Sequence, residues 1–292
     1  MRGYTRARIL EIVILVAPSL LFILGTVIFP TFYVAHTSLF DWFYGKRGAF
    51  IGLTNYWRLL NDPEFHQVFK NTLVYSLGGT FLGLFMGLLF ALFLDGVGQR
   101  TRNLMRVIVL VPYMISWVAA GVTFKWMFNT ETGVFNYLFL KFGLIGRPLN
   151  WLGEPRLAML SCIVTMAWAT VPFITLILLA GLQNIPRELY EAAAIDGANG
   201  FKKFRYVTMP LLRTPIFVCL LIRTIYSLRD FDIPFTITRG GPGLSTKVFA
   251  ILLREKLTNL DFGYNAALSM ALLVLVLGIT ALYTSLLGGD NT

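Results

Sequence analysis

The feature that most constrains this sequence is a set of six apolar stretches, each about 20 residues long. They lie at about 9–31, 71–94, 104–127, 157–182, 214–236 and 264–287. A helix of that length crosses the hydrocarbon core of a bilayer. Within lipid, a helix also satisfies all the backbone N–H and C=O groups of its own segment. The sequence therefore predicts an all-α integral membrane protein with six transmembrane helices.

The composition supports a lipid environment. Only 14% of the 292 residues are charged and 56% are apolar, whereas about a quarter of a soluble domain is charged. The net charge of +10 could indicate a nucleic-acid partner. However, the lysines and arginines mostly flank the apolar stretches, where membrane topology and anionic headgroups account for them. We expect a lipid membrane as partner and no nucleic acid.

The sequence offers little for metal or catalytic chemistry. Cys162 and Cys219 fall inside apolar stretches without metal-ligand spacing, and His36 and His66 lie in or near one polar loop. Neither a zinc site nor a Ser-His triad is indicated. We therefore expect no metal and no catalytic residue in this chain.

The distribution of basic residues predicts the orientation. Lysines and arginines are nearly balanced between the two sides, but the positive-inside rule gives most weight to short segments beside the first helices. There the tail "MRGYTRAR" and the loop "DGVGQRTRNLMR" are densely basic. We expect both termini in the cytoplasm, the loop 183–213 on the same side, and residues 1–292 as a single transmembrane domain.

Two loops on the opposite side have distinctive sequences. The stretch "FIGLTNYWRLLNDPEFHQVFKNT" mixes aromatic and polar residues around an Asp-Pro pair, which predicts a short interfacial helix before the second span. The stretch "ITRGGPGLSTKVF" contains a Gly-Gly-Pro-Gly turn cluster. Both loops are either plain connectors or a docking surface for an external partner.

The cytoplasmic loop 183–213 is unusually well patterned for a connector. Strong helix formers run through "RELYEAAAI", and Gly197 follows Asp196 where that helix is expected to end. A second helical stretch, Phe201–Met209, precedes Pro210 and Pro215. The pattern predicts a helix, a glycine turn and a second helix outside the membrane. Composition alone leaves open a solvated amphipathic connector.

This loop resembles the EAA loop of the permease subunits of ABC importers. In that family the loop is the coupling helix, which sits in a cleft on the ATP-hydrolysing subunit. The residues that carry the resemblance, and to which it assigns the coupling role, are Glu191, Ala192, Ala193, Asp196, Gly197, Ala198, Phe204 and Pro210.

Other segments extend the resemblance to the carbohydrate-uptake permeases, and among them to the larger permease of the maltose and oligosaccharide importers. They include "FIGLTNY", "RVIVLVPYMIS", "PLNWLGEP", "MPLLRTPI" and "FDIPFTITRGGPG". The resemblance implies the type I importer (MetI-like) fold, with its core at about 71–287, in a bacterial inner membrane. The chain departs from the maltose permease in lacking its additional N-terminal helices and large external domain.

No ATP-binding loop is present. A Walker A loop needs G-x-x-x-x-G-K-[ST], but Gly45-Lys46 is followed by Arg47. The chain is therefore expected to bind no cofactor itself, with ATP and magnesium bound by a partner. The resemblance implies a second, homologous permease subunit, a dimer of ABC ATPase subunits, an extracytoplasmic sugar-binding protein and a sugar substrate.

Ionisable residues inside spans are costly and indicate function. In the fifth stretch, Arg223, Tyr226, Ser227 and Asp230 fall at i, i+3, i+4 and i+7, which places them on one face of a helix. Arg229 and Asp232 are spaced to pair on another side. The stripe is either a solute pathway or a structural ion-pair network.

Aromatic and small polar residues near prolines in the third and fourth stretches offer matching faces, because sugar rings stack on aromatic side chains. The resemblance implies a lining made of Tyr113, Trp117, Ala169, Thr170, Phe173, Arg223, Tyr226, Ser227 and Asp230. Several of these identities differ from the maltose permease, so maltose itself is not favoured. An acidic sugar, an oligosaccharide and a polyol all remain open.

The alternative from another class is a membrane-embedded enzyme acting on a lipid-linked substrate, with Asp230 and Asp232 as its acids. Residues two apart point to opposite sides of a helix, which argues against a shared metal. A secondary transporter is a weaker third hypothesis, because no repeated half is visible in the sequence.

Overall fold

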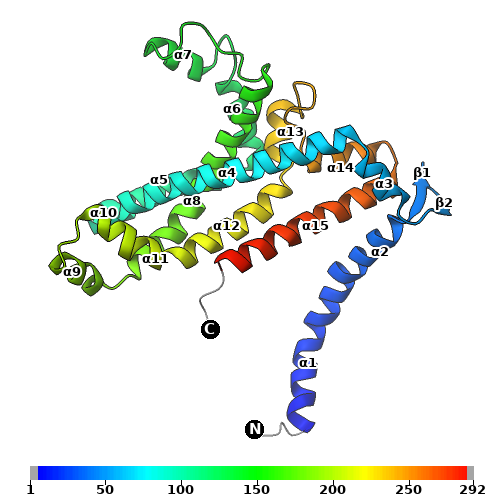
Figure 1. Cartoon of the computed structure of the whole chain (residues 1–292), viewed down its shortest axis with the longest axis horizontal. Helices are drawn as coiled ribbons and strands as arrows, with labels where there is room; N and C mark the ends of the chain where they lie inside the picture. The colour runs from blue at the N-terminus through cyan, green and yellow to red at the C-terminus, as the bar shows by residue number, and fades with distance from the viewer. Residues whose placement is uncertain (1–5, 288–292) are drawn as a thin grey trace. The chain divides into compact units, whose positions relative to one another are not determined.

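The computed structural model describes residues 6–287, with side chains from Val13 to Leu286. The basic tail with Arg2, the side chains of Arg6 and Arg8, and residues 288–292 lie outside this description, as do the two ends expected in the cytoplasm. Most of the described chain is helical (Figure 1).

In chain order the elements are α1 (Arg6–Ile23), the π-helix η1 (Leu24–Ile28), α2 (Phe29–Thr37), β1 (Phe40–Phe43), β2 (Lys46–Phe50), α3 (Thr54–Leu60), α4 (Pro63–Gly96), α5 (Gln99–Met114), α6 (Trp117–Met127), α7 (Val134–Lys141), α8 (Pro155–Gln183), α9 (Arg187–Ile195), α10 (Gly200–Lys203), the π-helix η2 (Phe204–Thr208), α11 (Met209–Leu211), α12 (Arg213–Leu228), α13 (Asp232–Thr238), α14 (Phe249–Thr258) and α15 (Phe262–Leu287).

Four helical segments are long and apolar enough to cross a membrane without interruption, namely Val13–Thr37, α4, α8 and α15. Two bent helix pairs also pass the same test of length and hydropathy: α5 meets α6 at 92°, and Gly200–Leu211 meets α12 at 60°. Counting each bent pair as one span gives six. The predicted all-α membrane architecture with six spans is confirmed, with a short β1–β2 hairpin that the sequence did not predict.

The third span differs from the continuous helix expected over 104–127. Pro112 lies in the last turn of α5, where a proline removes a backbone donor. Ile115 is then extended, and Ser116 caps α6 by accepting a hydrogen bond from the Ala119 amide at 3.2 Å. A proline followed by a serine N-cap ends one helix and starts another, because the cap stabilises a new N-terminus.

The fifth span also differs from the continuous helix expected over 214–236. α12 ends at Leu228, and α13 starts only at Asp232. Asp230 therefore lies beyond the helix, and the expected i, i+7 register with Arg223 does not apply to it. The expected pairing of Arg229 with Asp232 is wrong for the same reason, and the Arg229 guanidinium instead lies 5.6 Å from the Tyr226 ring centroid.

By contacts the chain divides into two compact units. One comprises the residues up to Asp62 together with Leu253–Leu273. In it, the buried Asn55 amide donates to the carbonyl oxygens of Ser38 and Phe40 at 2.9 and 3.0 Å. α3, the short helix expected before the second span, follows the β1–β2 hairpin. These bonds join α3 to the start of the hairpin.

The other unit comprises Pro63–Leu252 and the chain from Val274 onward, and it contains all the residues expected to line a pathway or to couple to an ATPase. Its central pair is α4 packed on α8. A Cβ added at Gly83 would meet Thr170 Oγ1 at 2.8 Å, and one at Gly87 would meet Ile174 Cγ2 at 2.6 Å. Small residues four apart let two membrane helices approach closely.

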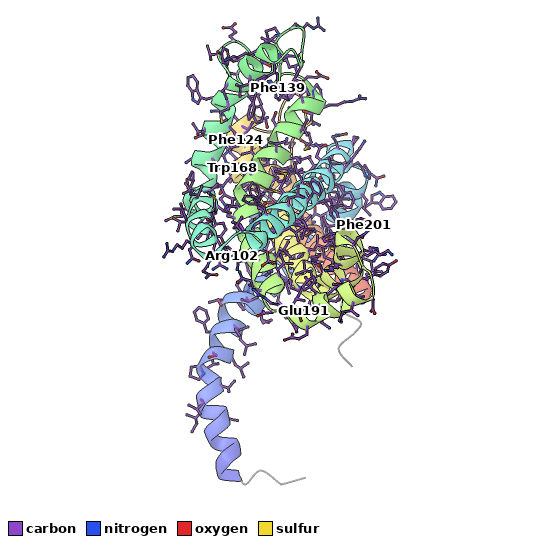
Figure 2. The ribbon with its side chains drawn as sticks, turned by 90° about the vertical axis from the view of Figure 1, so that its left-hand side faces the viewer. Arg102, Phe124, Phe139, Trp168, Glu191 and Phe201 are labelled. Atoms are coloured by element: carbon purple, nitrogen blue, oxygen red, sulfur yellow. The ribbon has the colours of Figure 1, made fainter. Side chains whose placement is uncertain are left out.

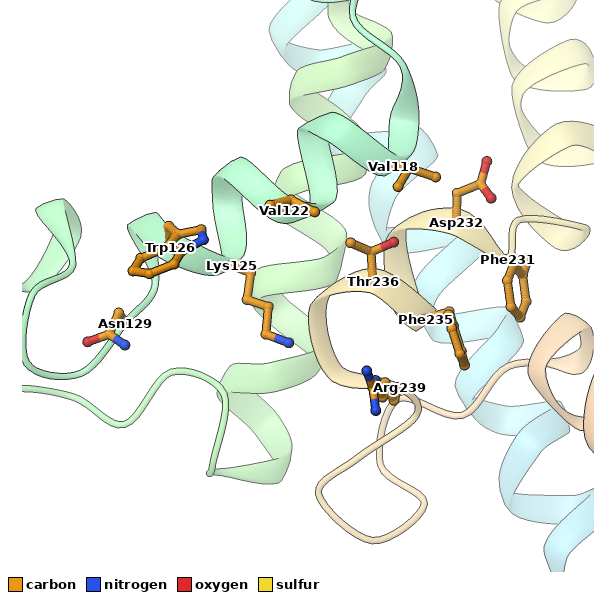
Figure 3. A pocket seen from close by; sticks show the side chains of 10 residues that line it. All are labelled: Val118, Val122, Lys125, Trp126, Asn129, Phe231, Asp232, Phe235, Thr236 and Arg239. Atoms are coloured by element: carbon orange, nitrogen blue, oxygen red, sulfur yellow. The ribbon is translucent and has the colours of Figure 1, made fainter.

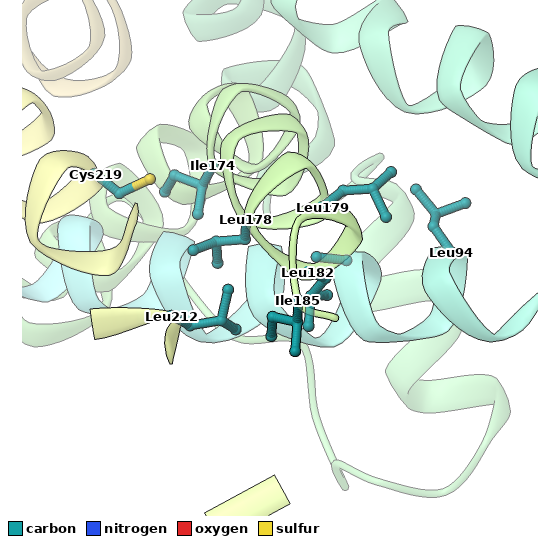
Figure 4. Packing of buried hydrophobic residues seen from close by; sticks show 9 residues of the cluster. Leu94, Ile174, Leu178, Leu179, Leu182, Ile185, Leu212 and Cys219 are labelled. Carbon is teal, nitrogen blue, oxygen red and sulfur yellow. The ribbon is translucent and has the colours of Figure 1, made fainter. Parts of the chain in front are cut away.

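An apolar cluster from α4, α8 and α12 forms the core of the larger unit at the end near the loop 183–213 (Figure 4). Its buried members are Ala91, Leu94, Ile174, Leu178, Leu179, Leu182, Ile185, Leu212 and Cys219. Cys219 is buried with a free thiol, as expected for an apolar filler. The cluster anchors the helices from which the loop projects.

Candidate substrate pathway and coupling loop

A cavity of about 590 Å³ lies beside two interruptions of the helices, one between α5 and α6 and the other between α12 and α13. Its lining is Trp117, Tyr226, Arg229, Asp230, Phe231 and Asp232. Trp117 is the first residue of α6, and the other five residues span the end of α12 and the start of α13. Non-helical backbone at membrane depth is tolerated where it lines a cavity or is covered by protein. The cavity therefore accounts for the non-helical backbone at these two interruptions.

The Asp230 carboxylate is held by the chain itself. Asp230 is buried, and its Oδ2 accepts a short hydrogen bond from the Tyr75 hydroxyl on α4. Its Oδ1 accepts from the Asp232 amide at 3.0 Å. One turn away, the hydroxyls of Ser76 and Ser227 are hydrogen-bonded. These bonds tie the end of α12 to α4 and fix one wall of the cavity.

Arg223 is buried without a matching acceptor. Only 5% of the residue is exposed, and its Nε and Nη2 have no hydrogen-bond partner. Its Cζ lies 5.3 Å from the Trp117 ring centroid, within cation–π range. Of the ion pairs found among residues 13–286, none includes Arg223 or Asp230. The ion-pair network considered from the sequence is not formed between them.

The remaining residues expected in the lining fall into two groups. The Tyr113 and Phe173 rings stack with centroids 6.1 Å apart at 18°, and Tyr113 is half exposed. Ala169 and Thr170 are buried, and Thr170 donates to the Ala167 carbonyl at 3.0 Å on the side of α8 that faces α4. The structure brings Trp117 together with Arg223 and with the end of α12, and places Thr170 in a helix contact.

A second cavity, of about 650 Å³, lies between α6 and α13 (Figure 3). It is lined by Val118, Val122, Lys125, Trp126, Asn129, Phe231, Asp232, Phe235, Thr236 and Arg239. Phe231 and Asp232 line both cavities. α6 packs on α13, with Gly121 against Thr236. Sequence reasoning missed these residues because it took each span as one straight helix. The Pro112–Ser116 spacing was the signal for the break.

The loop 183–213 has the shape that its sequence predicts. α9 ends at Ile195 with Asp196 as its C-cap, and Gly197 follows with φ +73°. Asn199 caps α10 by accepting from the Lys202 amide at 2.9 Å. The hydroxyls of Tyr190 and Thr208, 3.0 Å apart, join α9 to η2. The predicted helix, glycine turn and second helix are confirmed. The loop lies at the opposite end of the larger unit from α7 (Figures 1 and 2).

The exposed face of this loop is more apolar than its motif suggests. Glu191, Ala192, Asp196, Gly197 and Pro210 are exposed, whereas Ala193, Ala198 and Phe204 are half-buried. The largest exposed apolar side chains of the loop are Ile195, Phe201 and Tyr206, at 87%, 75% and 74%. Sequence reasoning did not select these three. Phe201 and the motif residue Glu191 are marked in Figure 2.

Comparisons with known proteins agree with this architecture. The family model described as "Binding-protein-dependent transport system inner membrane component" matches residues 68–287. The trehalose/maltose transport system permease protein MalF of Thermococcus litoralis is 38% identical over 271 residues, which cover 92% of this chain and 91% of the relative. The sulfoquinovosyl glycerol transport system permease protein SmoG of Agrobacterium fabrum is 37% identical, over 93% and 88%.

A bacterial ABC transporter involved in the import of the acidic polysaccharide alginate contains a chain of the same fold. It superposes with a TM-score of 0.82 over 98% of both chains, at 22% sequence identity. The relatives named here are transport permeases, and nothing in these comparisons supports the membrane-enzyme alternative. The chain belongs to the family of binding-protein-dependent transport system inner membrane components.

Proposed function

We propose that this chain is one of two permease subunits of an ATP-driven ABC importer, and that its cargo is a sugar, a sugar derivative or a polyol. The observation that carries the proposal is the cavity at the two helix breaks. It presents the rings of Trp117, Tyr226 and Phe231 beside charged groups of Arg229 and Asp230. Aromatic faces stack on sugar rings, and a few placed polar groups bind hydroxyls.

Two relatives support a sugar as cargo, since their names record transport of trehalose or maltose and of sulfoquinovosyl glycerol. They cover most of this chain at more than a third identity. The cavity residues predicted from the resemblance, Trp117, Tyr226 and Asp230, lie together in the structure. An external binding protein would deliver the sugar to this permease, as the family description implies.

The loop 183–213 is proposed to grip a dimer of ABC ATPase subunits, which would bind ATP and magnesium. Its exposed apolar side chains, Ile195, Phe201 and Tyr206, suit a buried contact. The glycine turn at Gly197 fixes the angle between α9 and α10. Since this loop must face the ATPase, we place it and both termini in the cytoplasm.

Co-expression with a candidate second permease, ABC ATPase and binding protein tests the proposal. The chain should copurify with a second permease and an ATPase. In proteoliposomes with the binding protein, the complex should take up a sugar only when ATP is supplied on the ATPase side. ATP-independent uptake, or purification of the chain without any ATPase, would contradict the proposed function.

A further inference from the structure

In the larger unit, two positively charged groups lie next to Trp117. One is the N-terminus of α6, an 11-residue helix whose first residue lines the cavity. The other is the Arg223 guanidinium beside the Trp117 ring. Each is a feature that attracts an anion, and they come from different spans.

The N-terminus of α6 has backbone amides that lack a hydrogen-bond acceptor among the residues that the structure describes. The first N–H groups of a helix have no intrahelical acceptor. Ser116 Oγ accepts from the Ala119 amide, while the amides of Trp117 and Val118 form no hydrogen bond within the described part of the chain. These amides carry the partial positive charge of the helix dipole. Broken membrane helices use such ends to hold the anionic groups of their cargo.

Arg223 supplies the independent observation. It is more than nine-tenths buried, and its Nε and Nη2 are without an acceptor. The nearby Asp230 does not fill this role: its two oxygens accept from the Tyr75 hydroxyl and the Asp232 amide, and Nε and Nη2 of Arg223 reach neither of them. A buried charge without a partner is strongly unfavourable. The unused Nε and Nη2 are two of the donors that form a bidentate pair with an oxyanion.

The charges along the two cavities, which share Phe231 and Asp232 in their lining, also favour an anionic cargo. Lys125 and Arg239 line the second cavity and Arg229 lines the first. Asp232 lines both cavities and Asp230 lines the first. Together with Arg223, which contacts Trp117 but is in the lining of neither cavity, this gives four cations against the two carboxylates of Asp230 and Asp232.

Resting on the proposed function, we propose that Arg223 and the α6 N-terminus select a sugar that carries an acidic substituent: a carboxylate, sulfonate or phosphate. The sugar ring stacks on Trp117, and the acidic group lies between the guanidinium fork and the amides of Trp117 and Val118. A neutral sugar would leave Arg223 buried and unpaired, and binds more weakly.

The test compares two probes of the same shape, a digalacturonate and its methyl ester, in proteoliposomes that contain the whole complex and its binding protein. Arg223→Gln removes the charge and the fork, Arg223→Lys keeps the charge alone, and Arg147→Gln is the control in an exposed loop. Because every variant uses the same binding protein, a change in the acid-to-ester ratio arises in the permease.

We expect wild type and Arg147→Gln to prefer the acid, and Arg223→Gln to reduce uptake of the acid at least about tenfold with a smaller change for the ester. Arg223→Lys should raise the KM for the acid severalfold and keep the preference. Assembly is checked by size-exclusion chromatography. If Arg223→Gln fails to assemble, an unchanged KM in Arg223→Lys overturns the proposal.

An unchanged acid-to-ester ratio in Arg223→Gln would also overturn it. So would a wild-type complex that imports neutral sugars and no acidic one, and that outcome would leave the proposed function standing. A wild-type complex that imports no sugar with ATP would contradict the proposed function itself.

Discussion

The cavity and the cytoplasmic loop are built on opposite principles. In the cavity, buried polar groups are held by bonds between distant spans, such as Tyr75 with Asp230 and Ser76 with Ser227. In the loop, the side chains are largely exposed and the shape comes from local turns at Gly197 and Asn199. A site for cargo needs a fixed wall, whereas a site for a motor needs a surface that a partner can grip and move. Changes at the two sites should therefore fail in different ways.

The largest effect is expected from Gly197→Val. A β-branched residue at φ +73° is strongly disfavoured, so the turn between α9 and α10 must change. We expect uptake to fall at least about tenfold while membrane insertion is unchanged, because a Cβ at Gly197 has nothing within 4 Å. Uptake per ATP hydrolysed is the measurement. Gly200→Ala is the control, because Gly200 starts α10 and also has open space around it. Wild-type coupling in Gly197→Val would refute the role assigned to the turn.

The next largest effect is expected at the wall of the cavity. Tyr75→Phe removes a donor from the buried Asp230 carboxylate, at a cost of about 1.5–3 kcal/mol for a hydrogen bond to a charged group. The purified complex should lose thermal stability. Asp230→Asn in the same background should add much less than it costs alone, since the two side chains share one interaction. Additive losses from the pair would show that the bond contributes little.

A moderate effect is expected at the contact between α4 and α8. Gly83→Val places carbon atoms against Thr170, whose Oγ1 lies 2.8 Å from the added Cβ. Overpacking of this kind typically costs about 1–3 kcal/mol. Gly96→Val serves as the control, because nothing lies within 4 Å of its added Cβ. Thermal melting in detergent reports the difference, and equal melting of the two variants would contradict this packing.

The smallest effect on the permease itself is expected from Phe201→Ala with Tyr206→Ala. Both side chains are about three-quarters exposed, so the stability of the permease should change by less than about 0.5 kcal/mol. Copurification of the ATPase should nevertheless fall clearly. Retention of the ATPase at wild-type level would remove these aromatics from the contact, whereas loss of permease stability would show that they pack within the chain.

The same contrast explains how far the sequence could predict this protein. The loop is local, so the Asp196–Gly197 pair predicted its turn and the surrounding motif predicted its helices. The six spans followed from length and hydropathy alone. The break at Ser116 was not predicted because the hydropathy there is continuous. The position and hydrogen bonds of Asp230 were not predicted either. They depend on where α12 ends and on Tyr75, which lies more than 150 residues away in the sequence.

The sequence motif also did not predict which side chains of the loop are exposed. Ile195, Phe201 and Tyr206 are ordinary apolar residues in sequence, and only the packing of α9 on η2 shows that they face outward. Conversely, Thr170 is predicted in the lining by resemblance, while its hydroxyl in this structure bonds to its own helix. Helical spacing identifies a face, but the neighbour of that face is decided by tertiary packing.

The separation of the cargo site from the motor site is tested most directly by the number of sugars imported per ATP hydrolysed at saturating sugar. Trp117→Ala alters the cavity, so it should raise the KM for sugar severalfold and keep this number near wild type. Gly197→Val alters the loop, so it should lower the number at least about tenfold. If both variants changed the number equally, or if Trp117→Ala alone uncoupled transport, the two sites would not be separate as described.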